Sequence, residues 1–167
     1  ILSVLSAKKP KSGLEDITPI SRIIIESNLF IVRYDSPYKN MRNLIDSSKK
    51  APGSISYGIG SFGSIDHMIV HRIQKLTGVE INVLSFKSGS EATTALLGGH
   101  IASCGANPSE FIELYKAKKV SALAIALEKR NSDFPEVPTY KEQGIDIVSP
   151  SFRGFVAPAG IPIEAIS

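Results

Sequence analysis

Apolar residues follow two alternating patterns along the chain. Short runs rich in Ile and Val predict strands, because β-branched residues favour extended structure. Helix-length segments separate most of these runs, and strands that alternate with helices are typical of an α/β sheet with parallel pairs. The predicted strands lie at residues 22–25, 29–33, 55–57, 81–86, 101–104, 122–127 and 147–148.

The clearest predicted helix begins near Ser64, shows Ile65, Ile69 and Ile73 at helical spacing, and ends at Gly78. Start and stop signals predict other helices over 35–50, 90–97, from 107 onward and from 139 to 144. Several prolines follow residue 134, so the last third is expected to be rich in loops.

The boundaries of these other helices depend on local capping signals. Asp35 and Asn107 are the predicted N-caps, because a proline suited to the first helical turn follows each of them. Gly98 is expected to end the 90–97 helix in the left-handed conformation. Thr139 and Glu142 have the spacing of a capping box.

Composition is that of a globular protein: 43% of the 167 residues are hydrophobic and 21% are charged. The net charge is +3, but the basic residues are dispersed and form no stripe with interleaved aromatics, so no nucleic-acid partner is predicted. A basic balance equally favours small anions. No apolar run has the length of a membrane span, and no direct membrane insertion is predicted for this segment.

Residues that often carry chemistry do not form a known catalytic or metal pattern. Cys104 is the single cysteine and lies in a short apolar run, which favours a buried, unreactive thiol. His67 and His71 are four residues apart, but Met68 stands where the metalloprotease motif requires Glu. No catalytic residue, metal or cofactor is predicted.

A glycine-rich turn joins a predicted strand to the clearest predicted helix. Gly58, Gly60 and Gly63 have the spacing of the dinucleotide-binding fingerprint, and Ser61 and Ser64 add hydroxyl groups. Because a helix N-terminus has unpaired N–H groups and a positive dipole end, it attracts anions. The turn is therefore a candidate anion site.

The nucleotide interpretation of this turn has little further support. It requires an acid at the carboxyl end of the next strand, but the nearest acid, Glu80, lies at the other end. No Gly-Lys-Ser/Thr follows the glycines, and a Gly-x-Ser-x-Gly elbow is one residue out of register. A tight turn without any ligand stays open as an alternative.

Two further junctions resemble the first. Lys87, Ser88 and Gly89 follow the predicted strand 81–86, and Ala106 and Asn107 follow the strand 101–104. In α/β folds the carboxyl ends of parallel strands meet at one edge of the sheet, where ligands bind. The three junctions are expected to form one site.

Motifs in the same order resemble those of the substrate receptors of tripartite tricarboxylate transporters, the Bug-type periplasmic receptors. They lie at residues 14–20, 35–39, 57–67, 86–89, 96–99, 123–126, 135–139 and 154–160. The chain departs from the family pattern at Ile59, Ser61, Glu91 and Ala102, and it lacks the frequent Trp near residues 152–154.

The resemblance implies an α/β fold like that of type II periplasmic binding proteins, of which this chain would be mainly the second lobe. The implied division is 1–28 as a remnant of the first lobe, 29–157 as the second lobe with crossover strands at both ends, and 158–167 as the start of the return. The implied ligand-binding residues are Gly60, Ser61, Gly63, Ser64, His67, Lys87, Ser88, Gly89, Ala106 and Asn107.

The function implied by the resemblance is capture of a small carboxylate in the periplasm, or another compartment outside the cytoplasm, and its delivery to membrane transporter subunits. No covalent chemistry and no cofactor are part of this expectation. Two other classes stay open: a sensor or degenerate binding module of the same fold, and an enzyme that uses a nucleotide or a Ser or Cys nucleophile.

Overall fold

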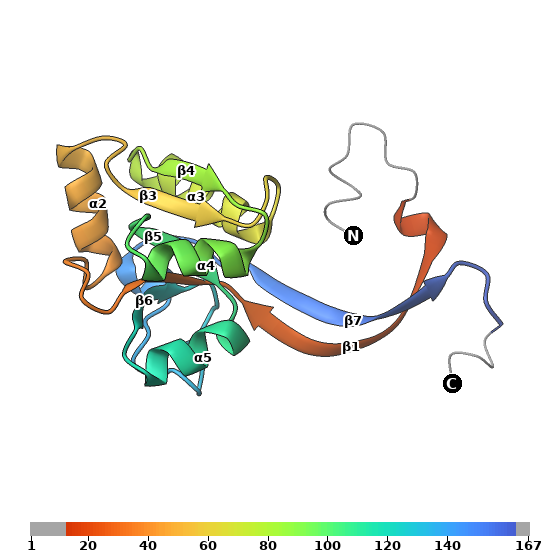
Figure 1. Ribbon diagram of the computed structural model, residues 1–167. Coiled ribbons are helices and arrows are strands. Elements are labelled where there is room, and N and C mark those ends of the chain that lie inside the picture. Colours follow the sequence, from red (N-terminus) through yellow and green to blue (C-terminus); the bar gives the residue numbers. More distant parts are fainter. Residues whose placement is uncertain (1–12, 163–167) are drawn as a thin grey trace. The chain divides into compact units, whose positions relative to one another are not determined.

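The structure, a computed structural model, describes residues 13–162, which belong to two compact units. One unit is the continuous segment Ser27–Pro150, and the other combines the segments before and after it. Figure 1 shows the order of elements in the continuous unit. They are β2 (Leu29–Arg33), α2 (Met41–Lys50), β3 (Ser56–Ile59), α3 (Ile65–Thr77), β4 (Asn82–Ser85), α4 (Gly89–Leu97), β5 (Ser103–Ala106), α5 (Pro108–Lys116), β6 (Val120–Ile125) and the 3-10 helix η2 (Lys141–Gln143).

The continuous unit is built on a five-stranded mixed sheet with the order β4-β3-β5-β2-β6. β3 pairs in parallel with β4 on one side and with β5 on the other. β2 runs antiparallel to both of its neighbours, β5 and β6. The carboxyl ends of β4, β3 and β5 therefore lie next to each other at one edge of the sheet, and the start of β2 lies at that same edge.

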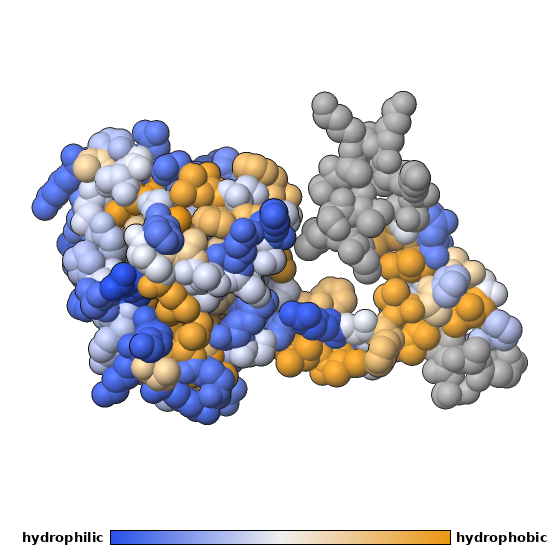
Figure 2. All heavy atoms as spheres, in the orientation of Figure 1, coloured by the Kyte–Doolittle hydropathy of each residue, from blue (hydrophilic) through white to orange (hydrophobic). Residues whose placement is uncertain are grey.

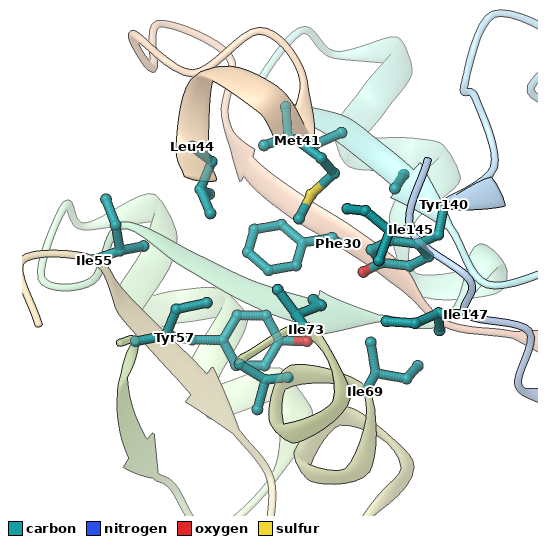
Figure 3. Packing of buried hydrophobic residues seen from close by; sticks show 14 of the residues in the cluster. Phe30, Met41, Leu44, Ile55, Tyr57, Ile69, Ile73, Tyr140, Ile145 and Ile147 are labelled. Atoms are coloured by element: carbon teal, nitrogen blue, oxygen red, sulfur yellow. The ribbon is translucent and has the colours of Figure 1, made fainter. Parts of the chain in front are cut away.

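Alternating side chains of β2 connect the sheet to helices on both faces. Phe30 and Val32 belong to a cluster that includes residues of α2 and α3, and Figure 3 shows Phe30 between Met41 and Tyr57. Leu29 and Ile31 belong to a second cluster, with residues of α4 and α5. All four of these strand residues are at most 1% exposed. The result is a three-layer α/β/α arrangement, as the alternation of strands and helices predicts.

The other unit contains a 3-10 helix, η1 (Leu14–Asp16), and a two-stranded sheet of β1 (Ile17–Ser27) and β7 (Pro150–Pro158). Contacts between Glu26 and Ser151 and between Asp16 and Ala159 show that these strands are antiparallel. Many of their apolar side chains are exposed, and Figure 2 shows these residues along the two strands. They are Ile20, Ile23, Ile24, Ile25, Phe152, Phe155 and Val156.

The local signals at both ends of α3 and at Thr139 and Glu142 are confirmed. Ser64 caps α3, and Gly78 ends it in the left-handed conformation, with φ of 68°. Thr139 and Glu142 make the two reciprocal hydrogen bonds of a capping box: the Thr139 N–H donates to Oε2 at 2.7 Å, and the Glu142 N–H donates to Oγ1 at 3.1 Å. The element that follows is a single 3-10 turn.

The predicted start of α2 is wrong. Asp35 accepts a hydrogen bond at 2.9 Å from Nε of Arg33 and does not cap a helix. The helix begins at Met41, where the Asn40 side chain accepts from the Asn43 N–H at 2.8 Å.

Three smaller expectations are also corrected. Residues 147–148 form no strand; Ile147 is fully buried in the core, but the segment is irregular. Gly98 has φ of −73°, and the left-handed residue after α4 is Gly99, with φ of 73°. The Asn107 side chain makes no capping hydrogen bond at α5.

Ile59, one of the departures from the family pattern, is a core residue. It is the last residue of β3, is 0% exposed and lies in the same cluster as Tyr57. A hydroxyl side chain at this position would be enclosed by apolar groups, where an unpaired hydroxyl is unfavourable. The isoleucine therefore contributes to packing below the glycine turn.

Candidate ligand-binding site

The three strand-to-helix junctions lie at the edge where β4, β3 and β5 end. Gly60, Ser61, Gly63 and Ser64 form the first turn, between β3 and α3, and His67 lies in the first turn of that helix. Lys87 and Ser88 form the second junction, and Gly89 begins α4. Ala106 ends β5, and Asn107 precedes α5. Because adjacent strands carry them, all ten predicted site residues belong to this one edge.

The first two turns are in direct contact. A Cβ atom built on Gly60 would lie 2.9 Å from the backbone nitrogen of Gly89 and 3.2 Å from the carbonyl carbon of Ser88. Real Cβ atoms do not approach backbone atoms so closely, so this approach requires glycine at position 60. The absence of a side chain brings the N-termini of α3 and α4 together.

His67 holds the first turn in shape. Its backbone N–H donates to Oγ of Ser64 at 3.3 Å, and its Nδ1 accepts from the Gly63 N–H at 3.0 Å. With Nδ1 engaged as an acceptor, Nε2 is the ring nitrogen left to face other groups. The ring also contacts Phe62 edge to face, with centroids 5.2 Å apart. Gly63 has φ of 81°, which favours glycine.

The first turn offers backbone donors to a ligand. Ser61, Phe62 and Gly63 are exposed. Within the part of the chain that the structure describes, the N–H groups of Ser61 and Phe62 donate to no backbone or side-chain acceptor. Free donors beside the positive end of the α3 dipole suit a carboxylate.

The second turn is more restricted. Oγ of Ser88 accepts from the Glu91 N–H at 3.2 Å, and Oε2 of Glu91 accepts from the Lys87 N–H at 2.7 Å. Glu91 thus occupies one backbone donor and adds a negative charge at the N-terminus of α4. The Lys87 side chain is exposed and makes no ion pair within residues 13–162, so its ammonium is available to an anion.

Below the third turn lies a polar pair that the sequence analysis missed. The side chain of Asn28, directly before β2, donates a hydrogen bond to Oδ1 of Asp66 in α3. A Cβ atom on Gly105 would lie 2.5 Å from that oxygen and 2.9 Å from Oη of Tyr57, so glycine leaves room for both groups. The available signal was an acid directly before His67, but acids are common in first helical turns.

Burial raises the pKa of the Asp66 carboxyl from 3.8 to about 6. The charge of Glu110 raises this pKa further, and the hydrogen bond from Asn28 opposes the shift. A partly buried acid with a raised pKa, at the edge where parallel strands of an α/β sheet end, is typical of functional sites.

Both ends of the continuous unit lie at this edge. The carbonyl of Asn28 accepts from the Ala126 N–H at 3.2 Å, and the carbonyl of Ala126 accepts from the Ser149 N–H at 2.9 Å. Oγ of Ser27 lies 3.5 Å from the carbonyl oxygen of Ser149, to which it donates. The chain at Ser27 and Asn28 and the chain at Ser149 are thus held by hydrogen bonds next to the candidate site.

The geometry gives the enzyme alternatives little support. Cys104 is fully buried in β5, and burial raises the pKa of its thiol to about 12, so it is protonated at neutral pH. Among residues 13–162, no three His, Cys, Asp or Glu side chains come together as metal ligands.

No described helix combines the length and apolar character needed to cross a membrane.

Comparison with models of protein families assigns the chain to a family. Residues 5–167 match the model of the tripartite tricarboxylate transporter family receptor. The chain belongs to this receptor family. Among curated relatives, it is 35% identical over 149 residues to a protein encoded in the gbd 5′ region of Cupriavidus necator, covering 88% of this chain and 45% of the relative. It is 30% identical over 152 residues to BugT of Bordetella pertussis, covering 90% and 47%.

Solved structures share the fold. A protein of R. palustris solved with adipate superposes with a TM-score of 0.87 at 25% identity, covering 95% of this chain and 54% of the other. MatC of Rhodopseudomonas palustris with bound malate gives a TM-score of 0.85 at 21% identity, covering 99% and 57%. The receptor-like fold is therefore that of periplasmic binding proteins. This chain spans about half the length of its relatives, 45% and 47% of the two named above.

Substitution of Gly60 tests the contact between the first two turns. Gly60→Ala should lower the free energy of unfolding by about 1–3 kcal/mol, because the new methyl group meets the backbone of Gly89. Gly89→Ala is the matched control, since its Cβ meets nothing within 4 Å, and it should change stability by less than about 1 kcal/mol. Urea unfolding followed by circular dichroism measures both. Equal stability of the two variants would contradict the contact.

Substitution of Asp66 tests the cost of its charge. Because the folded-state pKa of about 6 exceeds the ordinary 3.8, the folded state alone holds the proton between these values. The free energy of unfolding should therefore fall as pH rises through this window. Asp66→Asn keeps an oxygen acceptor for Asn28 without the charge, and should be more stable than wild type by about 1–3 kcal/mol near pH 7.

Urea unfolding near pH 4 and near pH 7 gives this difference, with Asp46→Asn at an exposed position as the control. The gain of Asp66→Asn should shrink at the lower pH, where the wild-type carboxyl is protonated as well. A variant that is less stable than wild type near pH 7 would show that the charge stabilises the fold.

Proposed function

We propose that this receptor captures a small carboxylate at the edge formed by β4, β3 and β5 and delivers it to a membrane transporter. The observation that carries the proposal is the contact between the first two turns, with free N–H groups at Ser61 and Phe62 and the exposed Lys87 side chain. Family membership supports the same class of function, and structural relatives were solved with adipate and malate.

Each predicted site residue has a defined part in this proposal. The turn Gly60–Ser64 offers backbone donors and hydroxyls to one carboxylate group, and His67 keeps the turn in its binding conformation. Lys87 adds a positive charge, while Ser88 and Gly89 bring the N-terminus of α4 close. Ala106 and Asn107 lie at the third junction, next to Gly105, which adjoins Asp66. Binding, release and transfer to transporter subunits complete the cycle, and no covalent step is included.

Delivery to a transporter places the proposed function outside the cytoplasm. Ligand specificity in this proposal comes partly from the second, opposing lobe that the length of the relatives implies, because a clamp needs groups on both sides of its ligand.

One observation favours a second candidate, a sensor or weak binding module of the same fold. Glu91 accepts the Lys87 N–H at 2.7 Å and places a carboxylate at the second turn. An acid there repels an anionic ligand and reduces the donors that the turn can offer. The ligand titrations described next distinguish the two candidates, because a sensor or weak module should bind carboxylates with lower affinity than a receptor.

Thermal-shift and calorimetric titration of the complete natural protein test the proposal. The panel contains succinate, adipate, malate and benzoate, with ATP and NAD as contrast. A receptor should be stabilised by at least one carboxylate, by about 2.7 kcal/mol when ligand is present at about 100 times its Kd. Stabilisation by a nucleotide and by none of the carboxylates would exclude the proposal, and millimolar affinity would favour the sensor.

Gly63→Ala locates the binding turn. Gly63 has φ of 81°, so a side chain there strains the turn that His67 holds. Gly78→Ala is the matched control, because Gly78 has φ of 68° at the opposite end of α3. Both variants should lose about 1–2 kcal/mol of stability, but only Gly63→Ala should lose about tenfold in carboxylate affinity. Equal affinities in the two variants would place binding elsewhere.

A further inference from the structure

Asp66 is a charged group at the ligand edge to which the proposed function gives no role. It is the second residue of α3, the helix whose N-terminus presents the first turn. One residue, Ile65, separates it from the N-cap Ser64, so its backbone lies within one helical turn of the proposed ligand position.

Apart from the positive end of the α3 dipole, the described side chains provide little compensation for the charge of this carboxylate. Asn28 donates one hydrogen bond to Oδ1. Gly105 leaves the space in which Oδ1 approaches Tyr57. Within residues 13–162, no lysine, arginine or histidine forms an ion pair with Asp66.

A carboxylate bound at the first turn brings a second negative charge near the partly buried Asp66 carboxylate. Two like charges in a medium of low polarity repel each other, and the repulsion is relieved when one of them takes up a proton. A ligand at the first turn is held by several N–H donors that require its anionic form, whereas Asp66 has one. The proton therefore goes to Asp66.

We propose that the receptor binds its carboxylate ligand together with one proton, which Asp66 takes up from water as its carboxyl becomes neutral. This inference rests on the proposed function and adds a specificity-determining residue to it. Since each extra negative ligand charge near Asp66 strengthens the repulsion, the residue favours ligands that place only one carboxylate at the first turn.

The other titratable groups around Asp66 do not replace it in this role. Glu110 on α5 is a further acid, and its charge adds to the repulsion. Tyr57 on β3, Cys104 on β5 and Tyr140 carry their protons at neutral pH, because burial raises the pKa of each. His67 uses Nδ1 to accept from the Gly63 N–H, so this nitrogen is engaged in holding the first turn.

Calorimetric titration of the complete natural protein measures the proton directly. The probe is whichever of succinate, adipate and malate stabilises the protein most, since all three are fully ionised above about pH 7. Titrations near pH 7 in phosphate and in Tris, two buffers with different ionisation enthalpies, give the number of protons taken up. The expected uptake is between about half and one proton, and affinity should fall about tenfold between about pH 7 and 8.5.

Two amide variants assign the proton. Asp66→Asn should bind with no proton uptake and with an affinity that does not change with pH. Glu110→Gln makes the same chemical change on α5 and should retain the uptake. Tight binding by the wild type without uptake, or uptake that persists in Asp66→Asn, would overturn the inference and leave the proposed function intact. Failure of all three carboxylates to bind any variant would overturn both.

Discussion

Parallel pairing of β3 with β4 and β5 is the constraint on which the candidate site depends. Parallel neighbours end at the same edge, so the three helices that follow them begin at that edge. The core below this edge is apolar on both faces of the sheet, which holds the strand ends in place. Glycine at position 60 then allows the two central turns to touch.

Sequence alone could predict the features that depend on neighbouring residues. Ser64 and Gly78 bound α3 through contacts within one helical turn, and the alternation of strands and helices indicated where the junctions would meet. The predicted start of α2 failed because Asp35 pairs with Arg33, a competing interaction that a capping pattern does not include. The segment at 147–148 failed because apolar residues can fill a core without pairing as a strand.

The polar pair of Asn28 and Asp66 could not be found in the same way. Its members are 38 positions apart, and only the antiparallel position of β2 beside β5 brings them together. Asp66 and Glu91 are acids at helix N-termini that would otherwise attract anions most strongly. Both acids offset part of the positive field that the helix N-termini create at this edge.

The hydrogen bond from the Ser27 hydroxyl to the Ser149 carbonyl brings the two ends of the continuous unit together. Domains whose two ends lie close together can be inserted into another chain segment, because no long loop is needed to connect both ends to it. Ser27–Pro150 is thus a continuous segment inserted in the sequence between the two halves of the other unit. Because β1 and β7 lie almost entirely outside this segment, substitutions within it leave the residues that pair those two strands unchanged.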